Sequence, residues 1–199
     1  MAIYVVYDMS YTTYYRYIEG IWAAVGVLWL IAALATKRTA RSEPAGGRLL
    51  HIGIITAAFA LIFSDRLHAG PLAWRFVPDS PVAAWTGLIL TVAGCAFAVW
   101  ARLMLGRNWS GRVTVKQDHR LILKGPYNVV RHPIYSGFLL GLLGAALALG
   151  EWRGIAGLAL AFIGWGMKSR KEEAFMAEQF GAEYTEYQRE VKALIPFVL

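Results

Sequence analysis

The sequence has few of the residues that build an ordinary water-soluble domain. Only 17% of its 199 residues are charged, whereas 57% are hydrophobic, which is too apolar for a typical soluble fold. Its single cysteine, Cys95, excludes a disulfide framework and lies in an apolar run, so we expect it to serve packing. No G-x-G-x-x-G, no P-loop and no metal-spaced set of His and Cys occurs, so the common nucleotide cradles and zinc sites are absent as motifs.

Long apolar runs predict an all-α, multi-pass membrane protein with about five transmembrane helices. Among the first four of these runs, two are clearly shorter than the ~20 residues that an upright span needs, and the fifth is short as well, so flanking aromatic residues such as Trp152 and Trp165 are expected to complete them. The expected spans are residues 18–36, 49–63, 81–100, 134–149 and 152–167.

The basic residues are distributed unevenly among the loops. With these spans, 16 of the 20 Lys and Arg residues fall on the side that holds the carboxyl terminus. Because Lys and Arg are retained in the cytoplasm, we expect the amino terminus outside and the carboxyl terminus inside. The net charge of +7 is also compatible with nucleic-acid binding, but this topology explains the charge without a nucleic-acid partner.

The chain divides into halves of different character. Residues 1–100 resemble a plain membrane scaffold, while residues 101–199 interleave polar segments with the last two spans, so we expect a catalytic, cytoplasmic half there. Small residues at spacings of three and four line both of those spans, which predicts that the two helices pack tightly together as a hairpin. The small residues are Gly137, Gly141, Gly144 and Ala148 in one span and Gly154, Gly157, Ala161 and Gly164 in the other.

The tail after the fifth span is predicted to form an amphipathic helix. Its apolar residues share an arc of about 80°, and Glu173 falls inside this arc, where a carboxylate requires a partner. Gly181 is expected to break or bend the helix. The alternative is a solvated acidic segment lying on the membrane. The apolar residues of the arc are Met176, Phe180, Tyr184, Tyr187 and Val191.

Arg131, His132 and Tyr135 stand at the start of the fourth span, where unpaired polar groups are costly. Pro133 suits the first turn of a helix, so the following amides would face the basic loop and favour an anion. The alternative for Arg131 and His132 is interfacial anchoring. The pair Glu172-Glu173 ends the fifth span on the same side. Positive and negative walls together suit a zwitterion or a cationic cofactor.

At these residues the chain resembles the isoprenylcysteine carboxyl methyltransferase family, which consists of integral-membrane enzymes that use S-adenosylmethionine. In size it is similar to the shorter, prokaryotic members of that family. The resemblance covers about residues 102–199. It consists of His119-Arg120-Leu121-Ile122, Gly125-x-Tyr127, Arg131-His132-Pro133-x-Tyr135-x-Gly137, Glu172-Glu173, Phe180-Gly181-x-x-Tyr184-x-x-Tyr187 and Leu194-Ile195-Pro196-Phe197.

The resemblance implies which residues form the site. Arg131 and a basic residue before the glutamate pair would face the substrate. The family places an arginine at that second position, where this chain has Lys168, with Arg170 two residues later. Lysine lacks the bidentate geometry of a guanidinium, which leaves the substrate open. The residues implied to surround S-adenosylmethionine are His119, Arg120, Leu121, Ile122, Tyr127, His132, Pro133, Ile134, Tyr135 and Glu172.

Three functions are compared. The first is methyl transfer from S-adenosylmethionine to a lipophilic acceptor in the bilayer, such as the carboxylate of a prenylated cysteine. A thiol or amine acceptor would instead need His119 or His132 as a base.

The second is a membrane reductase that uses NADPH on a sterol-like or enone substrate, because such enzymes carry a similar R-H-P-x-Y-x-G element. The third is a non-enzymatic membrane scaffold or transport subunit, which would not require the polar loop. The glutamate pair and the F-G-x-x-Y tail favour the methyltransferase.

Overall fold

The computed structural model describes residues 2–34, 39–42, 45–106, 114–116 and 121–198. Within these residues the chain is α-helical, as expected, with one short antiparallel pairing of strands that the sequence did not indicate. The elements are α1 (Ala2–Leu34), β1 (Thr39–Ser42), α2 (Ala45–Phe63), η1 (Asp65–Leu67), η2 (Gly70–Ala73), α3 (Pro81–Leu105), β2 (Thr114–Lys116), η4 (Gly125–Asn128), α4 (Pro133–Leu149), α5 (Trp152–Phe180) and α6 (Ala182–Glu190).

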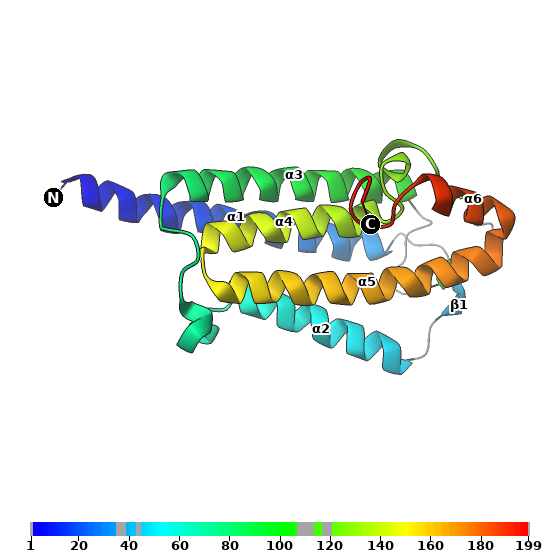
Figure 1. The fold of residues 1–199 in the computed structure, drawn as a ribbon, viewed down its shortest axis with the longest axis horizontal. Coiled ribbons are helices and arrows are strands. Elements are labelled where there is room, and N and C mark those ends of the chain that lie inside the picture. The colour runs from blue at the N-terminus through cyan, green and yellow to red at the C-terminus, as the bar shows by residue number, and fades with distance from the viewer. Residues whose placement is uncertain (1, 35–38, 43–44, 107–113, 117–120, 199) are drawn as a thin grey trace.

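The long helices α1 to α5 run roughly alongside one another as a bundle (Figure 1). One end of the bundle holds the amino terminus, the 3-10 helices η1 and η2 and the turn between α4 and α5. The other end holds β1, α6 and the carboxyl terminus (Figure 1). The segments predicted to be rich in basic residues therefore gather at one end of the molecule.

The boundaries of α3 follow from its flanking residues. Ser80 is the N-cap and accepts a hydrogen bond from the amide of Ala83 through Oγ at 3.3 Å, while Pro81 takes the first turn. The helix ends at Gly106, whose φ of 53° suits glycine. In the last turn, buried Arg102 donates to the carbonyls of Gly106 at 2.7 Å and of Ala32, in α1, at 2.9 Å. These contacts satisfy carbonyls that helix ends leave free.

Helices α3 and α4 pack with their backbones in close contact. A Cβ atom added to Gly94 would lie 2.4 Å from both the carbonyl oxygen of Gly137 and the amide of Gly141. Further along, a Cβ on Gly144 would lie 2.4 Å from the carbonyl oxygen of Gly87. Thr91 donates across the same interface to the carbonyl of Gly141 at 3.1 Å. Small residues thus let the two helices approach as they do in lipid.

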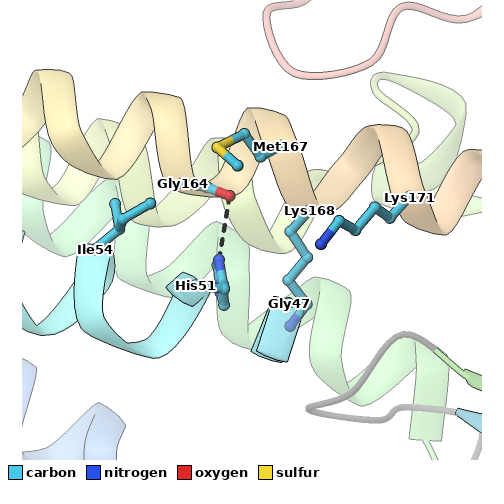
Figure 2. A pocket seen from close by; sticks show the side chains of 7 residues that line it. All are labelled: Gly47, His51, Ile54, Gly164, Met167, Lys168 and Lys171. Carbon is cyan, nitrogen blue, oxygen red and sulfur yellow. Dashed lines mark hydrogen bonds between the residues drawn. The ribbon is translucent and has the colours of Figure 1, made fainter. Parts of the chain in front are cut away.

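The small residues of α5 mainly meet α2. A Cβ on Gly157 would lie 2.7 Å from the carbonyl oxygen of Ala58, and one on Gly164 would lie 3.0 Å from Ile54 and Ile55. His51 of α2 also approaches the carbonyl oxygen of Gly164 with Nδ1 at 3.2 Å (Figure 2).

The expected packing of the two small-residue faces of α4 and α5 against each other is therefore wrong over most of their length. Near the turn, a Cβ on Gly154 would lie 3.0 Å from the Cα of Ala146, so the hairpin is close at its base. Beyond the turn, each helix uses its small face for another partner. The reason is that α3 carries its own small residues at matching positions, including Gly87, Gly94 and Ala98.

A buried ion pair holds the end of the bundle around the α4–α5 turn. Arg153 donates through Nε to Glu151 at 2.6 Å and through Nη1 to the carbonyl of Ser64 at 2.9 Å. His68 lies 3.1 Å from the same carboxylate. Buried charges are tolerated when they are paired and hydrogen-bonded in this way.

Three helices in the described part of the chain are long and apolar enough to cross a membrane: Thr13–Leu34, Gly46–Phe63 and Pro81–Leu105. Pro133–Leu149 is apolar but shorter. The expected fifth span, 152–167, is the first part of α5, which continues unbroken to Phe180 and includes the first part of the predicted tail helix. The count of five spans stays a prediction, while α-helical membrane architecture agrees with these segments.

The close contact between α3 and α4 makes a testable prediction. Gly94→Ala would force the new Cβ against backbone atoms, and overpacking of this kind typically costs about 1–3 kcal/mol. We expect a lower thermal unfolding temperature in detergent. Gly26→Ala in α1 is the control, because a Cβ there would meet nothing within 4 Å. An equal unfolding temperature for both variants would contradict the proposed tight interface.

Candidate active site at the start of α4

The site is built where the loop before α4 meets the carboxyl-terminal tail. His132 is the N-cap of α4 and Pro133 takes its first turn, as predicted. The amides of Arg131 and His132 donate to the carbonyls of Lys192 and Ala193 at 2.8 and 3.0 Å. Ser136 adds a bond through Oγ to the carbonyl of Leu194 at 2.6 Å. The start of α4 is thus fixed to residues about sixty positions later.

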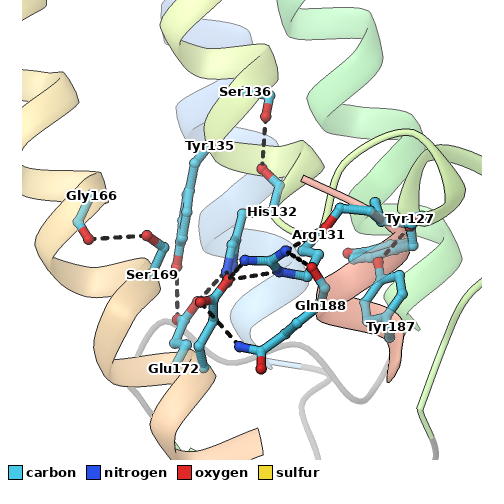
Figure 3. Close-up of polar contacts among 12 residues, drawn as sticks. Tyr127, Arg131, His132, Tyr135, Ser136, Gly166, Ser169, Glu172, Tyr187 and Gln188 are labelled. Carbon is cyan, nitrogen blue, oxygen red and sulfur yellow. Dashed lines mark hydrogen bonds and ion pairs between the residues drawn. The ribbon is translucent and has the colours of Figure 1, made fainter. Parts of the chain in front are cut away.

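Glu173 joins three parts of the chain; two of its partners, Arg131 and Gln188, are shown in Figure 3. Arg131 donates to its Oε1 from Nε at 2.8 Å, and Nη2 lies 2.6 Å from the same oxygen. Gln188 of α6 donates to Oε2 at 3.3 Å. The remaining donor of Arg131, Nη1, bonds to the carbonyls of Gln188 and Val191. Glu173, which was predicted to need a partner on the apolar face of the tail, is thus paired with Arg131.

Glu172 anchors a second group of contacts, on the side facing α4. Tyr135 donates to Glu172 through its hydroxyl at 2.7 Å. The ring of His132 stacks beside that of Tyr135, with centroids 5.6 Å apart and planes within 9°. The ring of Trp165 lies 6.1 Å from that of Tyr135, again with the planes within 9°. Three parallel rings therefore lead from the apolar bundle to the charged cluster.

Both nitrogens of His132 face carboxylates. Nδ1 lies 3.5 Å from Glu172 and Nε2 lies 3.2 Å from Glu173. Burial by itself would lower the pKa of His132, but hydrogen bonds to the two carboxylates outweigh burial and raise this pKa above its ordinary value. His132 is accordingly held as an imidazolium, because only the charged ring donates from both nitrogens.

The pKa values of Glu172 and Glu173 are shifted in the opposite direction, below the ordinary carboxyl value. Burial raises the pKa of each, yet the hydrogen bond from His132, with further help from Lys168 at Glu172 and Arg131 at Glu173, lowers both pKa values. Their charges stabilise the folded state above the ordinary carboxyl pKa, and this contribution is lost as pH falls through the lowered values. The contribution of His132 is lost as pH rises through its raised value.

The tail packs as its amphipathic pattern predicted. Tyr184, Tyr187 and Val191 are buried together, with Met176 and Phe180 against them. The hydroxyl of Tyr187 donates to the carbonyl of Tyr127, and the hydroxyl of Tyr127 donates to the carbonyl of Ala101, at the end of α3. Gly181, with φ of 55°, ends α5 and separates it from α6.

The structure gathers many of the residues expected at the site. His132, Tyr135 and Glu172 are in direct contact, and Arg131 joins them through Glu173. Lys168 is buried, and its Nζ lies 5.7 Å from the centroid of the Tyr135 ring. The apolar members form the surrounding walls: Pro133 is fully buried, Tyr127 and Ile134 pack with Ile122, and Leu121 packs against the tail cluster.

The roles expected of Arg170, His119 and Arg120 stay predictions. Arg170 is exposed on α5 and is absent from the described contacts of the cluster. His119 and Arg120 lie outside the described residues.

Sequence reasoning missed Trp165 and Gln188 as members of the site. A signal for Trp165 was present, because Trp165, Lys168 and Glu172 follow the i, i+3, i+7 spacing of one helix face. Gln188 gave no such signal, since its contact with Glu173 depends on how α6 folds back after Gly181.

Comparison with known proteins identifies relatives. Residues 82–183 match the phospholipid methyltransferase family. A probable protein-S-isoprenylcysteine O-methyltransferase of Oryza sativa subsp. indica is 31% identical over 120 residues, which cover 58% of this chain and 62% of that protein. The cobalt-zinc-cadmium resistance protein CzcN of Cupriavidus metallidurans is 36% identical over 146 residues, which cover 73% of this chain and 63% of that protein. The chain thus spans somewhat over 60% of the length of these relatives.

A solved structure shares the fold. The eukaryotic intramembrane Ras methyltransferase ICMT superposes with a TM-score of 0.50 at 24% identity, over 75% of this chain and 63% of that chain. This agrees with the multi-pass helical membrane architecture and with the resemblance noted in the sequence. The family match spans α3, α4 and α5, the helices that position the site. From this match the chain belongs to the phospholipid methyltransferase family.

Proposed function

We propose that this protein is a membrane methyltransferase that moves a methyl group from S-adenosylmethionine to a lipophilic acceptor, namely the carboxylate of a prenylated cysteine or a similar isoprenoid lipid. The observation that carries the proposal is the contact of His132, Tyr135 and Glu172 at one end of an apolar helical bundle, inside the segment that matches the family. The relatives named as isoprenylcysteine O-methyltransferases support the acceptor. The reductase alternative has no comparable support.

The residues present fit the chemistry of S-adenosylmethionine. When bound, this cofactor supplies an activated methyl group on a cationic sulfur. An aromatic ring such as that of Tyr135 attracts a cation, and Nζ of Lys168 at 5.7 Å from its centroid shows that this ring is open to a cationic group. Glu172 suits the ammonium group of the cofactor. His119 to Ile122, Tyr127, Pro133 and Ile134 complete the cofactor site as the resemblance implies.

A carboxylate acceptor suits the charge states at the site. A carboxylate is already ionised at neutral pH, so positioning supplies much of the rate and no base is needed. His132, held as an imidazolium between two carboxylates, has no free site to take a proton. The raised pKa of His132 therefore favours a carboxylate over a thiol or an amine.

Lys168 is the cation best suited to orient the acceptor. It is buried beside Tyr135, whereas Arg170 is exposed. Arg131 is engaged with Glu173 and with carbonyls of the tail, so in this proposal its main effect on substrate is to position the start of α4. Residues 1–100 serve mainly as the membrane scaffold and residues 101–199 as the catalytic half.

Loss of the Glu172 charge should weaken cofactor binding. A hydrogen bond to a charged group contributes about 1.5–3 kcal/mol, so Glu172→Gln is expected to reduce affinity for S-adenosylhomocysteine by roughly 10- to 150-fold. Calorimetric titration in detergent measures this. Glu190→Gln, at an exposed position in α6, is the matched control. Equal affinity in both variants, with unchanged unfolding temperatures, would refute the assignment of Glu172.

The pH dependence of turnover distinguishes the acceptors. With N-acetyl-S-farnesylcysteine as test substrate, we expect kcat to stay level as pH falls through about 6.5, the ordinary histidine value, because no base has to be deprotonated. His132 keeps its proton below its raised pKa, and the glutamates keep their charge above their lowered pKa values. A steep fall of kcat below pH 7, accompanied by loss of activity in His119→Gln, would favour a thiol or amine acceptor.

The orientation in the membrane can be tested by reporter fusions. The 16 basic residues on one side, together with the gathering of β1, α6 and the carboxyl terminus at one end (Figure 1), support a cytoplasmic position for the site. Fusions at Gly46 and Leu199 should report the cytoplasm, and fusions at Met1 and Glu151 the outside. A signal from outside at Leu199 would reverse the orientation.

A further inference from the structure

A small cavity lies between α2 and α5, on the side of Lys168 that faces α2 (Figure 2). It is lined by Gly47, His51 and Ile54 from α2 and by Gly164, Met167, Lys168 and Lys171 from α5. Its space corresponds to about one water molecule, which is enough for a single oxygen atom of a larger group outside it.

The lining of this cavity is basic on one side. His51, Lys168 and Lys171 all border it, and its lining residues include no acid. In Figure 2, Lys168 reaches toward the start of α2 and Lys171 extends toward Lys168. Because the Gly164 carbonyl can only accept, His51 donates to it through Nδ1, which fixes the orientation of the ring. Basic groups around one small space attract an anion.

Lys168 connects this cavity to the site around Tyr135. The same side chain lines the cavity and approaches the Tyr135 ring, and its charge lowers the pKa of Glu172. An anionic group held in the cavity would therefore lie close to the residues assigned to the cofactor. Lys168 and Glu172 stand four residues apart on one face of α5, so the cavity and the glutamate cluster adjoin each other along one helix.

We propose that this cavity receives an oxygen of the acceptor's carboxylate, with His51 and Lys171 as positioning residues beside Lys168. The inference rests on the proposed function and adds two residues to it. His51 lies on α2, outside both the family-matched segment 82–183 and the carboxyl-terminal half. The amino-terminal half thus takes part in substrate recognition besides serving as scaffold.

The chemistry explains why an anion site would help both binding and release. Methyl transfer forms a bond between carbon and a carboxylate oxygen, breaks the bond between that carbon and the sulfonium sulfur, and leaves the electron pair on sulfur. No proton is transferred. The ester product is neutral, so its attraction to His51, Lys168 and Lys171 falls as soon as the reaction is complete.

The test compares an acid with its ester. Binding of N-acetyl-S-farnesylcysteine and of its methyl ester is measured by titration to the full chain in neutral detergent containing S-adenosylhomocysteine. The unmodified protein should bind the acid more tightly than the ester. Lys171→Gln and His51→Phe should each weaken binding of the acid about 2- to 5-fold, the range of a partly exposed ion pair. Binding of the ester and of S-adenosylhomocysteine should not change.

Matched controls come from the opposite end of the bundle. His68→Phe and Arg66→Gln remove a histidine and a cation at exposed positions at that end. Both variants should still bind the acid more tightly than the ester. Unchanged acid binding in the His51→Phe/Lys171→Gln double variant would overturn the inference. Equal loss of acid and ester binding would overturn it as well, because the cavity would then act through packing.

A phospholipid is the competing occupant. If phosphatidylglycerol raises the unfolding temperature of the unmodified protein but not of the double variant, while the double variant keeps its preference for the acid, the cavity takes a lipid phosphate and the inference fails. Failure of the proposed function is separate: it would appear as no S-adenosylhomocysteine binding and no methylation of the acid by the unmodified protein.

Discussion

The ion pair between Arg131 and Glu173 connects the parts of the structure on which the site depends. It joins the loop before α4 to α5, and the same two residues hold α6 and the tail through Gln188 and Val191. The pair is only partly buried, with 10% of the Arg131 side chain and 17% of the Glu173 side chain exposed, and removing one partner would leave the other charge poorly compensated. The pair therefore holds His132 next to Glu172, because His132 follows Arg131 in the chain and Glu172 precedes Glu173.

The packing of the bundle decides which side chains lie between α4 and α5 next to the site. Helices α4 and α5 are close at their turn, but α4 directs its small residues to α3 and α5 directs its small residues to α2. Between them stand large rings instead: Phe138 and Trp165 lie 5.6 Å apart, and Tyr135 stacks on Trp165. The polar cluster thus lies at the end of a group of aromatic rings rather than in a tightly closed helix pair, which suits the amphiphilic acceptor that we propose.

Local features were predictable because they depend on residues near one another in the chain. Pro133 begins α4, Gly181 ends α5, and the apolar arc of the tail is buried as its spacing indicated. The contact between the Arg131-His132 loop and the glutamate pair was also expected, since both lie at the same end of a helical hairpin. What could not be predicted was how Arg131 is used, because its donors go to tail carbonyls that the folding of α6 brings into reach.

By itself, the sequence determined the helical membrane architecture, the start of α4, the break at Gly181 and the identity of the charged groups, because hydropathy, proline and glycine act over a few residues. Only the tertiary structure decided which small-residue faces meet, that Trp165 completes the stack of rings, and that His51 of α2 comes next to Lys168. Those outcomes depend on contacts between segments far apart in the chain, and many faces with similar glycine spacing compete for the same partner.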